Sequence, residues 1–242
     1  MIKVIAPMAG ISDGNFLLKL IPYGFNVATL GGFNIDESSI DAGKKIISRG
    51  RKEFDLEMSN VFSFIKDESE LIRENSDVLI SCNVRSVNPE NVIKVSELDS
   101  VDIVEINCHC RQKELTSIGC GQSMLKRSDL SDYIVSVVDN ASSKVSVKIR
   151  ANVSGVDTLS IAKLVDESGA DFLHVDAMNP GVANADLDLI RRISGETDIC
   201  LIGNNSINSL ERAEDMVSAG ADGVSLARAC MNGKLDFDLS SL

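Results

Sequence analysis

DESGADFLHV at residues 166–175 and VSAGADGVSL at residues 217–226 are two versions of one pattern. Each contains the end of a helical segment, a glycine, the dipeptide Ala-Asp and an apolar strand. Glycine is the residue type that most readily ends a helix in the left-handed conformation. A helix that leads through a short turn into a buried strand is part of a repeated βα unit, so the pattern predicts a parallel sheet.

Short apolar runs rich in valine, isoleucine and leucine recur along the chain, separated by stretches with helical spacing. Eight such runs are present, which is the number of strands in a closed (β/α)8 barrel. We therefore expect an α/β fold, a single-domain TIM barrel that spans residues 1–242. The expected strands are Ile2–Ala6, Asn26–Leu30, Val78–Asn83, Val101–Asn107, Lys144–Ile149, Asp171–Asp176, Asp198–Gly203 and Asp222–Leu226. Residues 36–75 are less regular and predict an insertion after the second strand plus the helix before the third.

The composition restricts the compartment and the partners. No apolar run approaches the ~18 residues that span a membrane, and the N-terminus lacks the features of a signal peptide. We therefore expect a cytoplasmic protein with no membrane partner. The formal net charge of −12 argues against nucleic acid as a partner, because phosphate binding usually requires a basic surface.

Six cysteines in 242 residues are too few for a disulfide scaffold, and reduced thiols are expected. Cys108, Cys110 and Cys120 lack the paired C-x2-C spacing of common zinc sites, so we predict no metal site. Cys82 and Cys200 lie in apolar strand-like runs and are interpreted as small hydrophobic side chains.

Polar residues at the C-terminal ends of the expected strands are the candidates for function, because barrel enzymes build their sites there. In KVSVKIRA at 144–151, the period of two places Lys148 and Arg150 on the interior face. A lysine in that position needs an anion or a polar ligand, or an ion pair with Glu105. In the fourth strand Asn107 lies at the end, and in the sixth Asp176 lies at the mouth with His174 one layer deeper.

The last two βα units predict a phosphate site. The seventh strand ends in GNNSI at 203–207 and the eighth ends in LARAC at 226–230. Loops after these two strands often hold phosphate in barrels through backbone N–H groups. Arg228 adds a positive charge there.

Several stretches resemble the tRNA-dihydrouridine synthases, a family of FMN-binding TIM barrels related to the dihydroorotate dehydrogenases. APMAGISD at 6–13 is similar to the family's opening signature APMAGVTD. The segment 104–130 resembles its strand, asparagine, cysteine loop and Gly-x-Gly turn, and VKIR at 147–150 resembles its flavin-contacting lysine strand. LIGNNSI at 201–207 and GADGVSLARA at 220–229 are similar to its phosphate-binding strand ends.

The resemblance implies an FMN-dependent oxidoreductase that reduces the C5–C6 double bond of uracil, with NADPH or NADH as the electron donor. It implies Cys110 as the proton donor, Asn107 as a substrate contact and Lys148 as a ring contact. The remaining FMN contacts that it implies, together with Asp176 at the mouth, are Pro7, Met8, Ala9, Asn83, Asn204, Asn205, Ala227 and Arg228.

The sequence also departs from the family pattern, and alternatives stay open. His109-Cys110-Arg111 stands where the family usually has Gly-Cys-Pro, and Asp176 stands where a histidine is common. The helical domain that follows the family's barrel is not expected in this chain, which we interpret as a barrel-only variant. The open alternatives to a tRNA substrate are a small metabolite, as in a dihydroorotate dehydrogenase-like enzyme, and a non-catalytic barrel.

Overall fold

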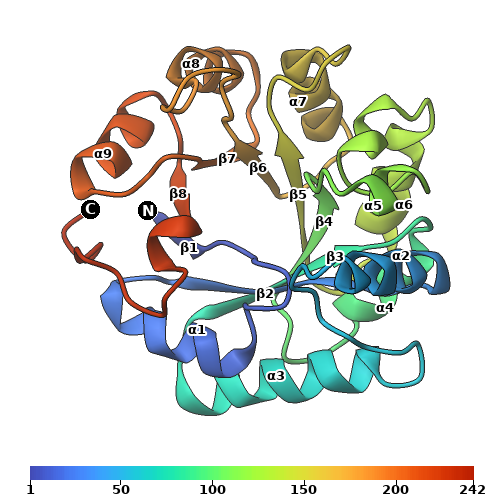
Figure 1. The fold of residues 1–242 in the computed structure, drawn as a ribbon. Coiled ribbons are helices and arrows are strands. Elements are labelled where there is room, and N and C mark those ends of the chain that lie inside the picture. The colour runs from blue at the N-terminus through green and yellow to red at the C-terminus, as the bar shows by residue number, and fades with distance from the viewer.

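The computed structural model describes residues 1–242 and shows eight parallel strands closed into one barrel in sequential order (Figure 1). Every neighbouring pair is parallel, including β1 with β8. The predicted TIM barrel is therefore confirmed, with each strand within a few residues of its expected position. The strands are β1 (Ile2–Ile5), β2 (Val27–Asn34), β3 (Leu79–Arg85), β4 (Ile103–Cys108), β5 (Lys144–Arg150), β6 (Phe172–Asp176), β7 (Cys200–Asn204) and β8 (Gly223–Leu226).

Helices surround the barrel and cover the outer face of the strands (Figure 1). The α-helices are α1 (Gly14–Leu20), α2 (Glu37–Ser48), α3 (Val61–Asn75), α4 (Glu90–Ser96), α5 (Lys113–Thr116), α6 (Leu130–Asn140), α7 (Thr158–Glu167), α8 (Leu187–Glu196) and α9 (Leu210–Ser218). Three 3₁₀ helices, η1 (Ile21–Tyr23), η2 (Gly121–Lys126) and η3 (Arg228–Cys230), complete the chain. None of the helices combines the length and the apolar character needed to cross a membrane.

The Gly-Ala-Asp repeat is explained by two structural roles. Gly169 and Gly220 follow α7 and α9 with φ of 79° and 103°, which is the left-handed cap that the sequence predicts. The aspartate then accepts a hydrogen bond from the backbone N–H of the second residue of the preceding strand. The same contact recurs four times around the N-terminal end of the barrel: Asn26 with Lys3 N at 2.7 Å, Asp102 with Ile80 N at 2.7 Å, Asp171 with Val145 N at 2.8 Å and Asp222 with Leu201 N at 2.8 Å.

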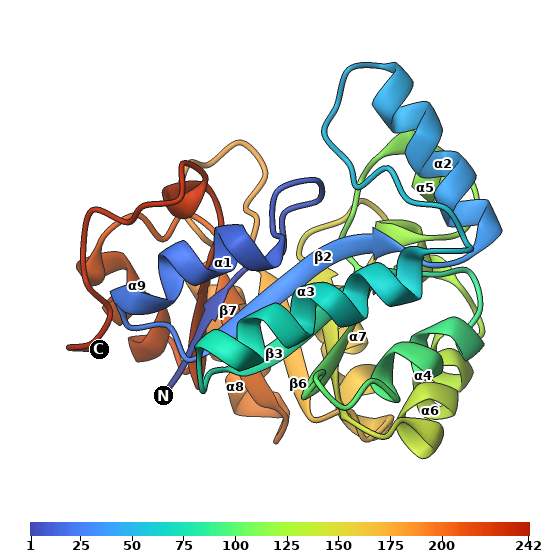
Figure 2. The same cartoon turned by 90° about the horizontal axis from the view of Figure 1, so that it is seen from below.

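The irregular region after β2 contains the predicted insertion. It forms α2, a loop at 49–60 and then α3, which leads into β3. Figure 2 shows α2 standing off the barrel beside α5, and Ile46 and Leu115 pack together between the two helices. The loop is anchored by Phe54, whose ring centroid lies 4.6 Å from that of Phe33 in β2. The insertion thereby carries Glu53 over the C-terminal end of the barrel.

Candidate active site

Two adjoining pockets occupy the C-terminal end of the barrel. The first, here called the ring pocket, has a volume of about 240 Å³, and the second, here called the arginine pocket, has about 540 Å³. His109, Arg111 and Arg150 line both, so the pockets are direct neighbours. Of the residues that the sequence predicts for this site, the ring pocket is lined by Pro7, Ala9, Asn83, Asn107, Cys110 and Lys148, and the arginine pocket by Asp176, Asn204, Asn205, Ala227 and Arg228.

Met8 is the one predicted site residue that lines neither pocket. Its carbonyl accepts hydrogen bonds from the backbone N–H groups of Ile11 and Ser12, and its own N–H donates to the Ser12 hydroxyl at 2.9 Å. The backbone of Met8 therefore holds the tight turn after β1. This turn places Pro7 and Ala9 at the pocket wall.

Asn107 at the end of β4 fixes the cysteine loop. Its Oδ1 accepts hydrogen bonds from the backbone N–H of His109 at 3.1 Å and of Cys110 at 2.9 Å. Its Nδ2 donates to Asn83 Oδ1 at 2.8 Å, and Asn83 Nδ2 donates to Glu105 at 2.8 Å. Because these amides lie on the interior faces of β3 and β4, a line of hydrogen bonds runs from the barrel centre to the loop.

Cys110 is partly exposed in the ring pocket, whereas Cys82, Cys108, Cys120 and Cys230 are buried. The loop is held from the other side by Gln122, whose N–H donates to the Cys110 carbonyl at 2.8 Å. A side chain at Gly121 would place its Cβ 2.2 Å from that carbonyl, and φ there is 63°, so only glycine fits. Cys110 is therefore the solvent-reached thiol of the pocket.

Arg85 and Glu53 form a buried ion pair beside Cys110 that the sequence analysis missed. Their side chains are 1% and 4% exposed, and Arg85 Nη1 lies 3.2 Å from Glu53 Oε1 and 3.8 Å from Cys110 Sγ. Burial lowers the pKa of Arg85, but the Glu53 carboxylate outweighs this and the net pKa is raised. Arg85 lies two residues after Asn83 in β3, so the alternation of the strand could have predicted that its side chain faces the barrel interior. Its partner Glu53 could not be predicted, because it lies in the irregular insertion.

Lys148 contacts His174 rather than forming the direct ion pair with Glu105 that was the alternative. Lys148 Nζ lies 3.0 Å from His174 Nε2, and His174 Nδ1 lies 2.8 Å from Glu105 Oε2. Burial lowers the pKa of His174 to about 4, and burial also lowers the pKa of Lys148. A neutral His174 therefore donates from Nδ1 to the carboxylate and accepts from the ammonium at Nε2. The lysine keeps two N–H groups for the ring pocket.

Asp176 lies at the mouth above the buried His174, as the period-two rule predicts for β6. Its Oδ2 lies 2.7 Å from His109 Nε2 and 3.1 Å from Arg150 Nη1, and its Oδ1 accepts from Asn205 Nδ2 at 2.6 Å. Burial raises the pKa of Asp176, but these partners outweigh it and hold the pKa well below its usual range. Since a carboxylate only accepts, His109 carries its proton on Nε2. Asp176 thus joins the cysteine loop to the β7 loop.

The arginine pocket collects cations from several elements. Arg212 and Arg228 are exposed there, and both Asn205 and Ser206 have positive φ, at 110° and 55°, so the backbone after β7 turns sharply. Asn204 is used internally, because its Nδ2 donates to the Ser225 carbonyl at 2.6 Å. Taken together, the two pockets are lined by the cations Arg51, Lys52, Arg85, Arg111, Lys148, Arg150, Arg212 and Arg228, against the acids Glu53 and Asp176.

This arrangement defines a parallel barrel whose C-terminal mouth is rich in positively charged side chains. The sequence model described as dihydrouridine synthase (Dus) matches residues 65–233. The chain belongs to the dihydrouridine synthase family.

Named relatives extend the comparison. An uncharacterised protein of Methanocaldococcus jannaschii is 36% identical over 242 residues, covering 97% of this chain and 91% of that protein. The tRNA-dihydrouridine synthase B of Vibrio cholerae is 21% identical over 235 residues, covering 93% of this chain and 66% of the relative. The probable tRNA-dihydrouridine synthase of Helicobacter pylori is 23% identical with 94% and 66% coverage. The chain thus spans about two thirds of the length of these two synthases.

Solved structures show the same fold. FabK from Thermotoga maritima superposes with a TM-score of 0.61 at 15% identity, covering 93% of this chain and 57% of that one. The thiamine phosphate pyrophosphorylase of Pyrococcus furiosus gives 0.56 at 15% identity, covering 97% and 88%. At these identities the likeness concerns the barrel alone, because one barrel fold supports many activities.

Proposed function

We propose that this chain is an FMN-dependent oxidoreductase that reduces the C5–C6 double bond of a uracil ring in RNA. The observation that carries the proposal is that two pockets adjoin at the mouth. A thiol and a lysine face one pocket, and Arg111 and Arg150 line both this pocket and the arginine pocket. A ligand with a flat ring and a phosphate tail requires a pocket for the ring beside a positively charged pocket for the phosphate.

The residues present fit FMN. Arg228, the backbone around Asn205 and the loop after β8 would hold the phosphate, as helix and strand ends do in other barrels. The ring would lie near Pro7 and Ala9, above the strand residue Gly32. A Cβ at Gly32 would stand 2.6 Å from Asn83 Oδ1 and would narrow the pocket. Bound FMN supplies a hydride from its N5, and NADPH or NADH is the proposed source of electrons.

Lys148 supports this chemistry as the cation of the ring pocket. It is almost fully buried and held from below by His174. An ammonium fixed in a water-poor pocket stabilises negative charge on a flat heterocycle more strongly than it would in water. Asn83 would add an amide contact to the ring from the neighbouring strand.

Cys110 is the proposed acid. In the reduction, a hydride is added at C6 of the uracil and the Cys110 thiol delivers a proton to C5, which leaves a thiolate that solvent reprotonates. A cation beside the thiol would favour the thiolate, but Glu53 balances the charge of Arg85. The Asn107 side chain and the Gln122 backbone N–H both bond the backbone of the cysteine loop, so the thiol would approach the substrate from one direction.

The charge distribution favours a polyanionic substrate. The protein carries a net charge of −12, yet its C-terminal mouth collects eight cations against two acids. Such local concentration steers an anion to the mouth while the rest of the surface repels it. A tRNA segment with an everted uridine fits this field, and the acidic remainder of the surface confines the contact to the mouth.

The test uses the purified chain of residues 1–242 loaded with FMN, reduced with NADPH or NADH, and incubated with unmodified tRNA transcripts. Dihydrouridine is measured by mass spectrometry after nuclease digestion. We expect dihydrouridine formation that depends on both FMN and tRNA. The Arg228→Ala variant should bind FMN less tightly than the parent chain. Turnover of free uridine without RNA would replace the RNA substrate with a small metabolite. Failure to bind FMN would leave a non-catalytic barrel and overturn the proposal.

A further inference from the structure

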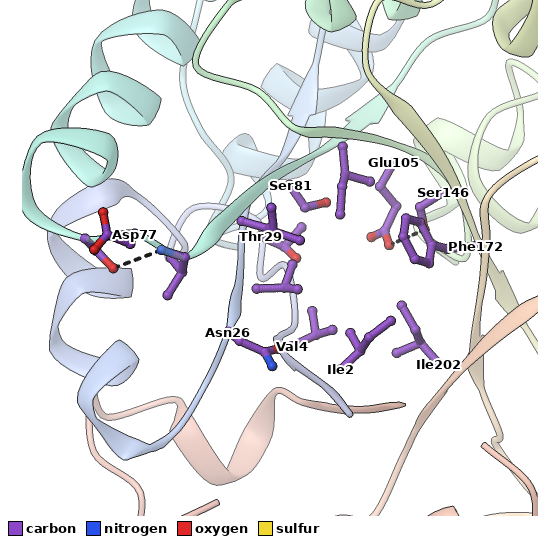
Figure 3. A pocket seen from close by; sticks show the side chains of 15 residues that line it. Ile2, Val4, Asn26, Thr29, Asp77, Ser81, Glu105, Ser146, Phe172 and Ile202 are labelled. Carbon is purple, nitrogen blue, oxygen red and sulfur yellow. Dashed lines mark hydrogen bonds between the residues drawn. The ribbon is translucent and has the colours of Figure 1, made fainter. Parts of the chain in front are cut away.

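A third cavity lies at the opposite, N-terminal end of the barrel. It has a volume of about 550 Å³ and is lined by interior side chains of the strands (Figure 3). TIM barrels normally fill this interior with three layers of bulky side chains. Here Thr29, Ser81 and Ser146 stand where branched aliphatic residues usually lie, and these small side chains leave the space open.

The walls and the inner end of the cavity differ in chemistry. The walls are hydrocarbon and consist of Ile2, Val4, Val27, Ile103, Phe172 and Ile202. The inner end carries the hydroxyls of Thr29 and Ser81 and the Glu105 carboxylate, which point toward the hollow (Figure 3). Such a pocket, apolar with a few convergent polar groups, has the composition and size of small-molecule sites.

Thr29 provides an independent sign of a missing partner. The residue is fully buried, and its Oγ1 has no hydrogen-bond partner within the protein. An unpaired buried hydroxyl costs about 1–3 kcal/mol, so buried polar groups in folded proteins are normally satisfied. Neighbouring atoms close the hydroxyl off from the cavity, so a ligand hydroxyl would satisfy it once the side chains at the inner end move apart.

The charges around the inner end restrict the ligand. Glu105 accepts from Ser146 Oγ at 3.0 Å and from His174 Nδ1 at 2.8 Å, and His174 connects it to Lys148. The carboxylate is thus already matched by a cation through the histidine. An anionic ligand would be repelled by Glu105. A cationic ligand would gain little, because the negative charge of Glu105 is already balanced by Lys148 through His174.

The entrance is apolar on one side. The pocket opens past Asn26 and the segment 76–79, and Leu79 at its rim is 45% exposed although it begins a barrel strand. An exposed leucine beside a hydrocarbon-lined cavity extends the apolar surface out to solvent. A hydrocarbon group can therefore enter along this side, while Asn26, Ser76 and Asp77 make the rest of the rim polar.

We propose that this cavity binds a small uncharged molecule that is mostly hydrocarbon and carries one hydroxyl at its inner end, an alcohol or a phenol. The hydroxyl accepts from or donates to Thr29 and Ser81, and the hydrocarbon part fills the space between Val27 and Phe172. The site is separate from the ring pocket, and the inference does not rest on the proposed function.

The test compares 4-propylphenol with propylbenzene and 4-propylbenzoate as probes of the full chain, with methyl NMR as the readout. We expect saturable shifts of the Ile103 and Ile202 methyls with 4-propylphenol, weaker binding of propylbenzene and none of the benzoate. The Ile134 methyl on the outer face of the barrel serves as an internal control, since it is buried between α6 and the strands.

Two variants test the inner end. Thr29→Val should weaken 4-propylphenol about 2- to 12-fold, the loss expected of one neutral hydrogen bond, without changing propylbenzene binding. Thr29→Ser, which keeps the hydroxyl, should bind like the parent. Ser81→Leu should fill the inner end and abolish both. A lack of saturable shifts, equal binding of the phenol and the hydrocarbon, or insensitivity to Thr29→Val would overturn the proposal.

Discussion

The two ends of the barrel are built from the same strands in opposite ways. The C-terminal ends carry polar interior residues that find partners across loops, as Asn107 does with the cysteine loop and Arg85 does with Glu53. The N-terminal ends carry aliphatic interior residues around a hollow. Interior polar groups at the C-terminal end require satisfied partners because they are removed from water. That requirement preorganises the mouth, whereas the other end leaves the Thr29 hydroxyl without a partner.

Glu105 lies between the two ends and touches both. Its carboxylate faces the cavity at the N-terminal end, here called the lower cavity, while Asn83 and His174 connect it to Asn107 and Lys148 toward the mouth. Burial raises the pKa of Glu105, but His174 and Lys148 outweigh this and lower it to about 2. The ionised carboxylate is therefore the common anchor for the residues that line the ring pocket.

The sharpest contrast between the ends is in their cysteines. Cys110→Ser should reduce dihydrouridine formation by about 10²- to 10⁴-fold, the range expected for loss of a positioned acid, while FMN stays bound. Cys200→Ser at the start of β7 is the matched control, because that thiol lies at the other end of the barrel. Rates are measured with tRNA transcripts at saturating reductant. An equal loss of dihydrouridine formation in both variants would show that Cys110 has no special role in the reaction.

Ion pairs at the two ends should differ in the free energy of unfolding. Glu53→Leu leaves Arg85 buried and unpaired, and removing one partner of a buried pair costs about 3–5 kcal/mol. Arg73→Leu removes a pair with Asp102 at the N-terminal end whose side chains are 39% and 28% exposed, and it should cost about 1 kcal/mol or less. Urea unfolding of both variants measures the difference. The double variant Glu53→Leu, Arg85→Met should recover much of the loss.

The contrast between the ends was only partly readable from the sequence. Strand positions, the C-cap glycines and the interior parity of Lys148, Asn107 and Asp176 follow from the periods of two and 3.6. Those signals are local. The pairing of Arg85 with Glu53 joins residues 32 positions apart through an irregular loop, and no local period encodes it.

Two other features depended on tertiary contacts. Asp176 meets His109, 67 positions earlier, and this pairing forms only because β4 and β6 flank β5. Met8 fits the family signature but is turned into the loop after β1 instead of lining the pocket. The lower cavity was not expected either, because a serine in a strand gives no indication of what its neighbours leave empty.

The centre of the barrel should make stability depend on pH. The pKa of His174 falls from about 6.5 in the unfolded chain to about 4 in the fold, so between these values the unfolded state binds one more proton. The free energy of unfolding should therefore rise with pH across this window, by about 3 kcal/mol in total. Urea unfolding at pH 4.5, 5.5 and 6.5 measures it.

His174→Gln should remove most of this slope and His109→Asn should remove less, since the His109 side chain is 28% exposed while the His174 side chain is fully buried. The chain has only these two histidines, which makes the comparison clean. An unchanged slope in His174→Gln would mean that the proton uptake occurs at other groups, and the neutral state assigned to His174 would be wrong.

The smallest expected effect concerns two buried threonines in opposite circumstances. Thr29→Val removes an unpartnered hydroxyl at the lower cavity and should raise the free energy of unfolding by about 1 kcal/mol. Thr158→Val removes a hydroxyl that accepts from Asn152 N at 3.0 Å and should lower it by about 1 kcal/mol. Changes of opposite sign in the free energy of unfolding, measured with urea, would show that the effect of Thr→Val depends on whether the hydroxyl has a hydrogen-bond partner. A loss in both variants would show that the Thr29 hydroxyl is already satisfied in solution.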